Sequence, residues 1–292
     1  MISTRVRAGL FATTAFSAMM LAGCSSSSPE AEPTAASSAD ATATAPVETA
    51  LETVTEGKLT IATGEPAYEP WVVGDAPETG EGFEAAVAYA VAEELGFDDS
   101  DVVWVRTGFD EAIAPGAKDW DLNIQQFSIT DERKQAVDFS SPYYTTTQAV
   151  VATGDSPFAG ATTIADLAGA KVGVAVGTTS YDVAVEKLGD DDLAVYNSVA
   201  DVVAALNAGQ IDAFVTDLPG AFYSAYVEVD NGAILGQFAG SEGGDEFGIV
   251  LPKDSALTEP VTEAVDALRD NGVLTSLESE WLSEAVDVPV LG

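Results

Sequence analysis

The sequence predicts an α/β fold, because strand-like and helix-like segments alternate along the chain and this succession occurs twice. The first succession starts with the apolar segment 59–63, and the second starts with a helix signal near residue 163. Strands that alternate with helices usually pair in parallel, so each half should form a mostly parallel sheet flanked by helices. The two halves meet near residues 148–154.

In the first half, apolar side chains recur at helical spacing from Phe83 to Leu95, and Gly96 ends this helix. A shorter helix ends at Pro115-Gly116. The predicted elements are strand 59–63, helix 83–95, strand 102–105, helix 109–113 and strand 122–124.

Helix-capping signals mark the second half. Thr163 with Asp166, and Ser198 with Asp201, have the spacing of a capping box, in which side chains satisfy the free amides of the first helical turn. The predicted elements are a helix from 163 to Gly169, strand 171–176, helix 177–188, a helix from 198 to Gly209, strand 211–215 ending at Asp217, strand 247–251 and helices to Leu282.

The first residues differ from the rest of the chain. Arg5 and Arg7 precede an uncharged segment from Ala8 to Leu21, which predicts a secretory signal peptide over residues 1–23. The segment Leu21-Ala22-Gly23-Cys24 resembles the lipobox of bacterial lipoproteins. That resemblance implies a diacylglyceryl group, with palmitate chains, on Cys24 and attachment to the outer face of the cell membrane. The alternative is an ordinary signal peptide whose cysteine is incidental.

Residues 24–56 are rich in Ser, Ala, Thr, Pro and Glu and contain few large apolar side chains. Such a composition cannot bury enough surface to fold, so we interpret this segment as a disordered tether. Because Cys24 is the only cysteine, no intramolecular disulfide can form.

The chain is strongly acidic, with 11 basic and 48 acidic residues and a formal net charge of −37. This balance argues against nucleic-acid binding, which needs a basic surface. The acidic surface suits a salty environment or, alternatively, attracts cationic solutes. The chain has no histidine, so histidine metal sites and histidine general bases are excluded.

The motif Phe127-Ser128-Ile129-Thr130-Asp131-Glu132-Arg133 is followed by Val137-Asp138-Phe139-Ser140 and by Pro142-Tyr143-Tyr144. Shorter matches are Tyr68-Glu69-Pro70-Trp71, Gly82-Phe83-Glu84, Gly177-Thr178-Thr179 and Ile211-Asp212-Ala213. Together these motifs resemble the bacterial extracellular solute-binding proteins of family 3, which are receptors of ABC importers for polar amino acids. The resemblance extends from Lys58 to Leu282.

The resemblance implies a two-lobed fold of the periplasmic-binding-protein type (type II), with two crossover hinge strands and a ligand cleft between the lobes. We expect lobe 1 to comprise residues 57–148 and 243–292, and lobe 2 to comprise residues 149–242. Ligands of open α/β sheets bind at the carboxyl ends of the strands, where Glu65, Tyr68, Thr179 and Asp217 fall.

The resemblance assigns the carboxylate of a free amino acid to Arg133, whose planar guanidinium suits bidentate contact. Ser128 adds a hydroxyl, while Thr178 and Thr179 open a helix whose amides favour an anion. Asp217 would hold the ammonium. The alternatives are a surface ion pair of Arg133 with Asp131 or Glu132, and plain helix caps at Thr179 and Asp217.

The resemblance places the ligand's side chain among six residues, with core packing as the alternative for the aromatic pair Tyr68 and Phe109. They are Glu65, Tyr68, Trp71, Phe109, Gln125 and Gln126. Glu65 matches an acidic position that meets a cationic side chain in some relatives and a neutral amide in others. The sequence therefore leaves the choice among basic, amide and other polar amino acids open.

We expect a monomeric binding protein that has no catalytic activity, cofactor or metal and that delivers a free amino acid to the permease subunits of an ABC importer. The alternative is an enzyme on the same scaffold, such as a cyclohexadienyl dehydratase, in which Glu65 would act as an acid.

Overall fold

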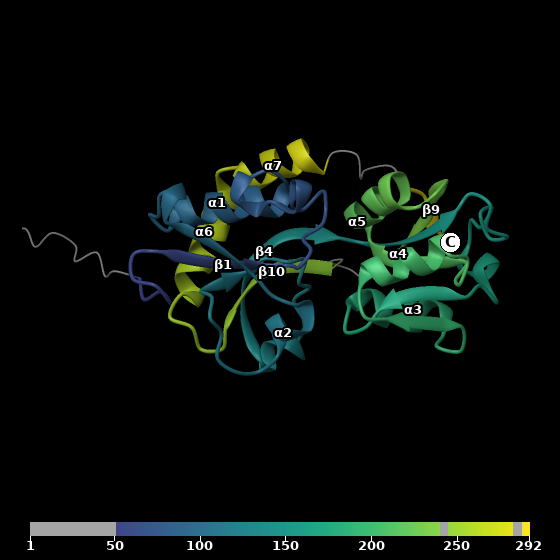
Figure 1. Ribbon diagram of the computed structural model, residues 1–292, viewed down its shortest axis with the longest axis horizontal. Helices are drawn as coiled ribbons and strands as arrows, with labels where there is room; N and C mark the ends of the chain where they lie inside the picture. The colour runs from purple at the N-terminus through teal and green to yellow at the C-terminus, as the bar shows by residue number, and fades with distance from the viewer. Residues whose placement is uncertain (1–50, 240–244, 283–287) are drawn as a thin grey trace, which may run out of the picture. The chain divides into compact units, whose positions relative to one another are not determined.

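The computed structural model describes residues 51–239, 245–282 and 288–292. They form two β-sheets with helices packed on both faces of each (Figure 1). The predicted signal peptide, Cys24 and most of the predicted tether lie outside the described residues. No helix in the described part of the chain has the length and apolar character needed to cross a membrane.

The first sheet has the strand order β2-β1-β3-β10-β4. Its two faces are covered by different side chains of the same strand: Leu59 and Ile61 pack toward α1, α6 and α7, whereas Ala62 packs toward α2. Figure 1 shows α1 and α7 on one side of this sheet and α2 on the other. The strands are β1 (Leu59–Thr63), β2 (Val102–Arg106), β3 (Leu122–Asn123), β4 (Val137–Thr146) and β10 (Asp245–Pro252), and the helices are α1 (Phe83–Glu94), α2 (Phe109–Ile113), α6 (Thr258–Asp270) and α7 (Val273–Trp281).

The second sheet has the order β11-β9-β5-β8-β6-β7. Val150 and Ala152 of β5 face the core beneath α3, and the alternating Ala149 and Val151 face the core beneath α4 and α5. The strands are β5 (Gln148–Thr153), β6 (Val172–Ala175), β7 (Leu193–Tyr196), β8 (Ala213–Asp217), β9 (Gly232–Phe238) and β11 (Val290–Leu291), and the helices are α3 (Thr179–Leu188), α4 (Val199–Asn207) and α5 (Leu218–Tyr223).

The described elements pass between the sheets three times. β4 passes through Thr147 directly into β5, β9 of the second sheet precedes β10 of the first, and α7, which packs on the first sheet, precedes β11 of the second. In the described part of the chain, every antiparallel strand pair involves β5 or β10. Both sheets are therefore mixed, with two of four strand pairs parallel in the first sheet and three of five in the second. β5 and β10 enter from the other sheet and not through a helical crossover on their own sheet, so nothing requires them to run parallel to their neighbours.

The capping signals have the predicted effect. Thr163 and Asp166 form a reciprocal capping box, and Ser198 accepts a hydrogen bond from the amide of Asp201. The segment after Thr163, however, is a single 3-10 turn, η5 (Ile164–Leu167), and not an α-helix. The remaining irregular turns are η1 (Val73–Asp75), η2 (Pro77–Thr79), η3 (Asp99–Asp101), η4 (Arg133–Gln135) and the π-helical turn η6 (Ser224–Glu228).

Two boundaries differ from the prediction. Residues 51–56 are part of the folded unit, because Leu51 packs against the first core and the amide of Val54 donates to Asp121 at 2.7 Å. The last strand, Val290–Leu291, pairs with β9 in the second sheet, although we assigned 243–292 to lobe 1. Both segments are too short for a periodic pattern, so their sequence does not reveal their pairing partner.

Candidate binding site

A cavity of about 490 Å³ is lined by residues that follow strands of both sheets. It lies at the carboxyl ends of β1, β3, β6 and β8, where the sequence analysis expected a ligand. All predicted site residues except Trp71 line it: Glu65, Tyr68, Phe109, Gln125, Gln126, Ser128, Arg133, Thr178, Thr179 and Asp217.

The side chain of Arg133 is buried and makes contact with both lobes. Its Nη1 donates to the carbonyl of Ser128 at 2.7 Å, and its Nη2 donates to the carbonyl of Gly177 at 3.0 Å. The guanidinium carbon lies 5.3 Å from the centre of the Phe109 ring. Burial lowers the pKa of Arg133, and the nearby carboxylates of Asp217 and Asp245 oppose that change.

The charge of Arg133 is not neutralised by direct contact. Among the described residues, no carboxylate oxygen lies within 4.0 Å of its guanidinium, so the alternative ion pair with Asp131 or Glu132 is not formed. A buried cation without a carboxylate partner favours an anionic ligand group.

The start of α3 lies beside Arg133. Thr178, and not Thr179, is the N-cap, because its hydroxyl accepts a hydrogen bond from the amide of Tyr181 at 3.2 Å. The Thr179 hydroxyl is instead 3.1 Å from the Ser128 hydroxyl and donates to Asp245 Oδ2 at 3.0 Å. First-turn amides have no partner within the helix, so α3 offers donors to a carboxylate in the cavity.

Asp217 lies at the end of β8, in the second lobe. Its Oδ1 accepts a hydrogen bond from Gln148 Nε2 at 2.7 Å, and it makes no side-chain capping bond to α5. The alternative role as a helix cap is therefore not observed. Burial raises the pKa of Asp217 to about 7, and the neighbouring charge of Asp245 acts in the same direction. The hydrogen bond from Gln148 and the charge of Arg133 oppose this rise.

Glu65, Asp110 and Glu111 also line the cavity, and only Glu65 of these three was predicted. Asp110 and Glu111 directly follow the predicted site residue Phe109. This adjacency is the sequence feature from which they could have been predicted as cavity residues. Phe109 stacks on Phe127 with ring centres 4.6 Å apart, which fixes that wall. Gln125 Oε1 is buried and has no hydrogen-bond partner among the described residues, so it can accept from a ligand.

Gly177 lies where the two lobes approach each other. It has a φ of +72°, and a Cβ added to it would lie 2.9 Å from Asp110 Oδ1. Both the left-handed conformation and this close approach favour glycine. Because Gly177 has no side chain, its backbone can lie close to Asp110, in the position where the Gly177 carbonyl accepts the hydrogen bond from Arg133.

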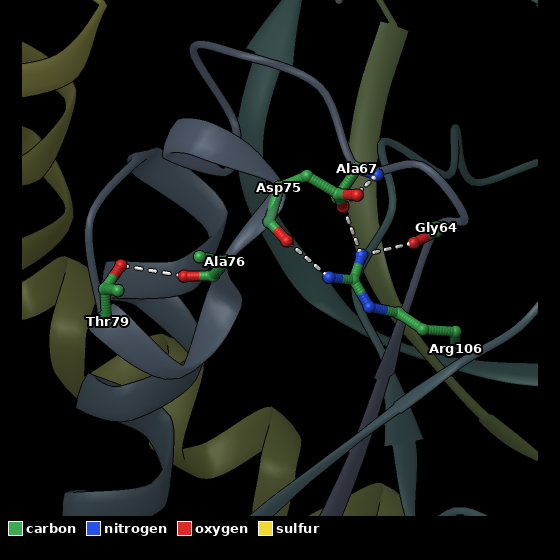
Figure 2. Close-up of polar contacts among 6 residues, drawn as sticks. All are labelled: Gly64, Ala67, Asp75, Ala76, Thr79 and Arg106. Carbon is green, nitrogen blue, oxygen red and sulfur yellow. Dashed lines mark hydrogen bonds and ion pairs between the residues drawn. The ribbon is translucent and has the colours of Figure 1, made fainter.

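A hydrogen-bonded clip holds the loop that carries Glu65 and Tyr68 (Figure 2). Arg106 Nη1 donates to the carbonyl of Gly64 at 2.7 Å and to Asp75 Oδ1 at 2.6 Å, while Nη2 donates to the carbonyl of Asp75 at 2.6 Å. Asp75 Oδ1 also accepts from the amide of Ala67 at 2.9 Å. The clip fixes both ends of the loop, so the two cavity residues are presented from an ordered segment.

Gln126 is hydrogen-bonded to Glu84, a fully buried residue in the first turn of α1. The backbone amide of Gln126 donates to Glu84 Oε1 at 2.7 Å, and its side-chain amide donates to Oε2. The hydroxyl of Tyr143 donates to Oε1 as well. Burial raises the pKa of Glu84 to about 7, against the effect of these hydrogen bonds. Gln126 has a φ of 51°, which this anchor stabilises.

Trp71 was placed in the site by the sequence analysis, but it is a core residue. It is 3% exposed and packs against the rings of Phe83, Tyr144 and Phe247. It lines only a smaller neighbouring cavity of about 60 Å³. A large aromatic side chain gains more from such a cluster than from the wall of a hydrated cleft.

The described residues contain no group of three or more acidic or cysteine side chains arranged to hold a metal ion.

The model of one protein family, the bacterial extracellular solute-binding proteins of family 3, matches residues 59–284. The L-arginine-binding protein of Pseudomonas aeruginosa is 32% identical over 232 residues, which cover 75% of this chain and 86% of that protein. The L-cystine-binding protein of Escherichia coli is 30% identical over 208 residues, which cover 70% of this chain and 75% of that protein. The solved structure of an ancestral arginine-binding protein bound to glutamine matches with a TM-score of 0.64 and 28% identity, covering 78% of this chain and 98% of that one.

Proposed function

This chain belongs to the bacterial extracellular solute-binding proteins of family 3, and on that basis we propose that its cavity captures a free polar amino acid for import. The observation that carries the proposal is the placement of Arg133 and Asp217 on the same cavity, one from each lobe. An α-amino acid has one carboxylate and one ammonium, and these two residues match them in charge.

Capture would proceed by closure of the two lobes, the first built on residues 51–147 and 245–282 and the second on residues 148–239 and 288–292. Support comes from two of the crossing connections, β4–β5 and β9–β10, at which a hinge would turn. A zwitterion bound by residues of both lobes favours the closed state, because the full set of contacts exists only there.

We propose that the preferred ligand has a cationic side chain. Besides Asp217, three carboxylates line the cavity, Glu65, Asp110 and Glu111, whereas Arg133 is the only cationic side chain among the described residues that line it. Relatives that bind L-arginine and L-cystine support an amino-acid ligand but do not agree on its side chain.

The experiment that tests this function is a thermal-shift screen of residues 51–292 against the twenty amino acids, ornithine, citrulline and cystine. A ligand at about 100 times its Kd should raise the free energy of unfolding by about 2.7 kcal/mol. No shift with any of them would overturn the proposal.

Glu65→Gln should weaken the binding of a cationic amino acid by more than tenfold, or ~1.4 kcal/mol, because it removes one negative charge that would face the ligand's side chain. Calorimetry would measure the Kd, with Glu93→Gln on the exposed face of α1 as the matched control. An unchanged Kd in Glu65→Gln would indicate a neutral ligand.

The second candidate is an enzyme of the cyclohexadienyl dehydratase kind, since a carboxylic acid, Glu65, and an aromatic ring, Phe109, line the same cavity. Incubation with prephenate or arogenate distinguishes the two functions. Formation of a new aromatic product would contradict a protein that only binds and releases its ligand.

We further propose that Cys24 carries a diacylglyceryl anchor, that residues 1–23 are a cleaved signal peptide, and that the protein acts as a monomer beside the permease of an ABC importer. The lipobox-like segment Leu21-Ala22-Gly23-Cys24 supports the anchor. Two acyl chains are sufficient for stable attachment to a membrane. Cys24→Ser should release the protein into the medium with its ligand affinity intact, and continued membrane attachment of this variant would contradict the anchor.

A further inference from the structure

Gln148 is a buried amide at the point where the chain crosses from the first sheet into the second. It is the first residue of β5, it pairs with Asp217 across the sheet, and it is 4% exposed. Its Nε2 donates to Asp217 Oδ1 and to Asp245 Oδ2, each at 2.7 Å, and its Oε1 accepts from the Ser180 hydroxyl at 2.7 Å. Both amide N–H groups and the amide oxygen therefore have partners.

The two carboxylates that Gln148 joins come from different parts of the fold. Asp217 ends β8, whereas Asp245 begins β10, the second crossing strand, opposite Thr146. Asp245 also accepts from Thr179, which in turn lies 3.1 Å from Ser128. One uncharged amide thus connects both crossing strands, the end of β8 and the start of α3.

Two carboxylates bound to one nitrogen repel each other and would otherwise rotate apart. An amide NH₂ satisfies both without adding a charge, so Asp217 keeps its negative charge available to a cation in the cavity. A glutamate at this position would offer no donor and would add a third negative charge. An apolar side chain would leave both carboxylates without this partner.

We propose that Gln148 is a positioning residue of the binding site: its amide holds Asp217 in the orientation that receives the ligand's ammonium group and ties that carboxylate to Asp245 at the hinge. This inference rests on the proposed function, since it assigns the ammonium to Asp217. It differs from a purely structural role, because it should affect the ammonium end of the ligand more than the carboxylate end.

The test compares ligands with and without the α-ammonium group. The probes are L-arginine with 5-guanidinopentanoic acid, and L-glutamine with glutaramic acid, each measured by competition calorimetry. Gln148→Met should lower the affinity for the amino acid that the wild type binds by at least about tenfold, which is the effect of losing one charge-assisted contact. It should lower the affinity for the matching acid, which lacks the ammonium, by a clearly smaller factor. Gln148→Glu should cause a larger loss for the amino acid, again with a smaller loss for the matching acid.

Gln237→Met is the matched control. Gln237 also lies at the crossing, where it accepts from the Thr147 hydroxyl at 2.6 Å and donates to the carbonyl of Val288 at 2.7 Å, and it does not line the cavity. Circular dichroism and the unfolding midpoint would establish that each variant is folded. An equal loss for both members of a probe pair, or no loss for either, would overturn the inference. A wild-type protein that binds no amino acid would instead overturn the proposed function, and the inference with it.

Discussion

Replacing Arg133 with alanine is expected to lower the affinity for an amino acid by at least about thirtyfold. Removing one partner of a buried, hydrogen-bonded charge pair costs about 2–5 kcal/mol, and each ~1.4 kcal/mol is a factor of ten. In the part of the chain that the structure describes, Arg133 is the only cationic residue lining the cavity, so none of the neighbouring side chains there can replace it. The affinity of Arg133→Lys should lie between those of the wild type and Arg133→Ala, because an ammonium keeps the charge but lacks the planar pair of donors.

The unfolding midpoint of the unliganded protein should change much less than the affinity. Among the described residues, the side chain of Arg133 donates only to the backbone carbonyls of Ser128 and Gly177. Ser128 lines the cavity and Gly177 stands between the lining residues Val176 and Thr178, so water can take the place of the guanidinium. The control is Arg269→Ala, which removes a half-exposed arginine that contacts Asp266 on the surface of α6. Calorimetry that gave Arg133→Ala a wild-type Kd would refute the carboxylate role.

The second large effect is on pH dependence. With the pKa of Asp217 at about 7, the unliganded protein carries a proton there in mildly acidic solution. The ligand's ammonium needs the ionised carboxylate, so binding must release that proton. Affinity should therefore fall about tenfold for each pH unit below about 7 and level off above it.

Calorimetry between about pH 5 and about pH 8, in buffers of different ionisation enthalpy, would measure both the affinity and the proton release. Asp217→Asn should remove most of this dependence and lower the affinity at high pH, because the neutral amide offers no negative charge to the ammonium. An affinity that stays constant across this range in the wild type would contradict the assignment of the ammonium to Asp217.

The stability of the unliganded protein should show the opposite trend with pH. Asp217 and Glu84 both have a pKa raised to about 7 in the folded state, against about 4 in the unfolded chain. Between these values the folded state binds more protons than the unfolded state. The free energy of unfolding therefore decreases as the pH rises from about 4 to about 7.

The sequence predicted most of the fold because its signals are local. Gly96 and Gly189, with φ angles of 86°, end α1 and α3, and the hydroxyl of Ser198 begins α4. Five strands, β4, β5, β7, β9 and β11, were not among those predicted from the sequence pattern. Leu193–Tyr196 is only four residues long, and Gly232–Phe238 begins and is interrupted by glycine, so neither has a clear alternation of apolar and polar side chains.

The candidate site was predictable where a residue follows a strand and not where it acts through another residue. Thr179 and Asp217 stand at strand ends, which is a position that the chain order reveals. Gln148 and Asp245 are brought together only by the pairing of strands that are distant in sequence. Trp71 was misplaced because its neighbours in sequence do not show whether an aromatic ring turns toward the core or the cavity.

The anchor beneath Gln126 limits how the binding preference of this protein can be redesigned. Any substitution of Gln126 removes a donor to the buried carboxylate of Glu84 and must also accept a φ of 51°. Gln125, Asp110 and Glu111 line the same cavity, and none of the side-chain hydrogen bonds of the described residues joins them to Glu84. A library that varies these three positions and keeps Gln126 should retain more folded variants, so new specificities are most accessible at α2 and at Gln125, which follows β3.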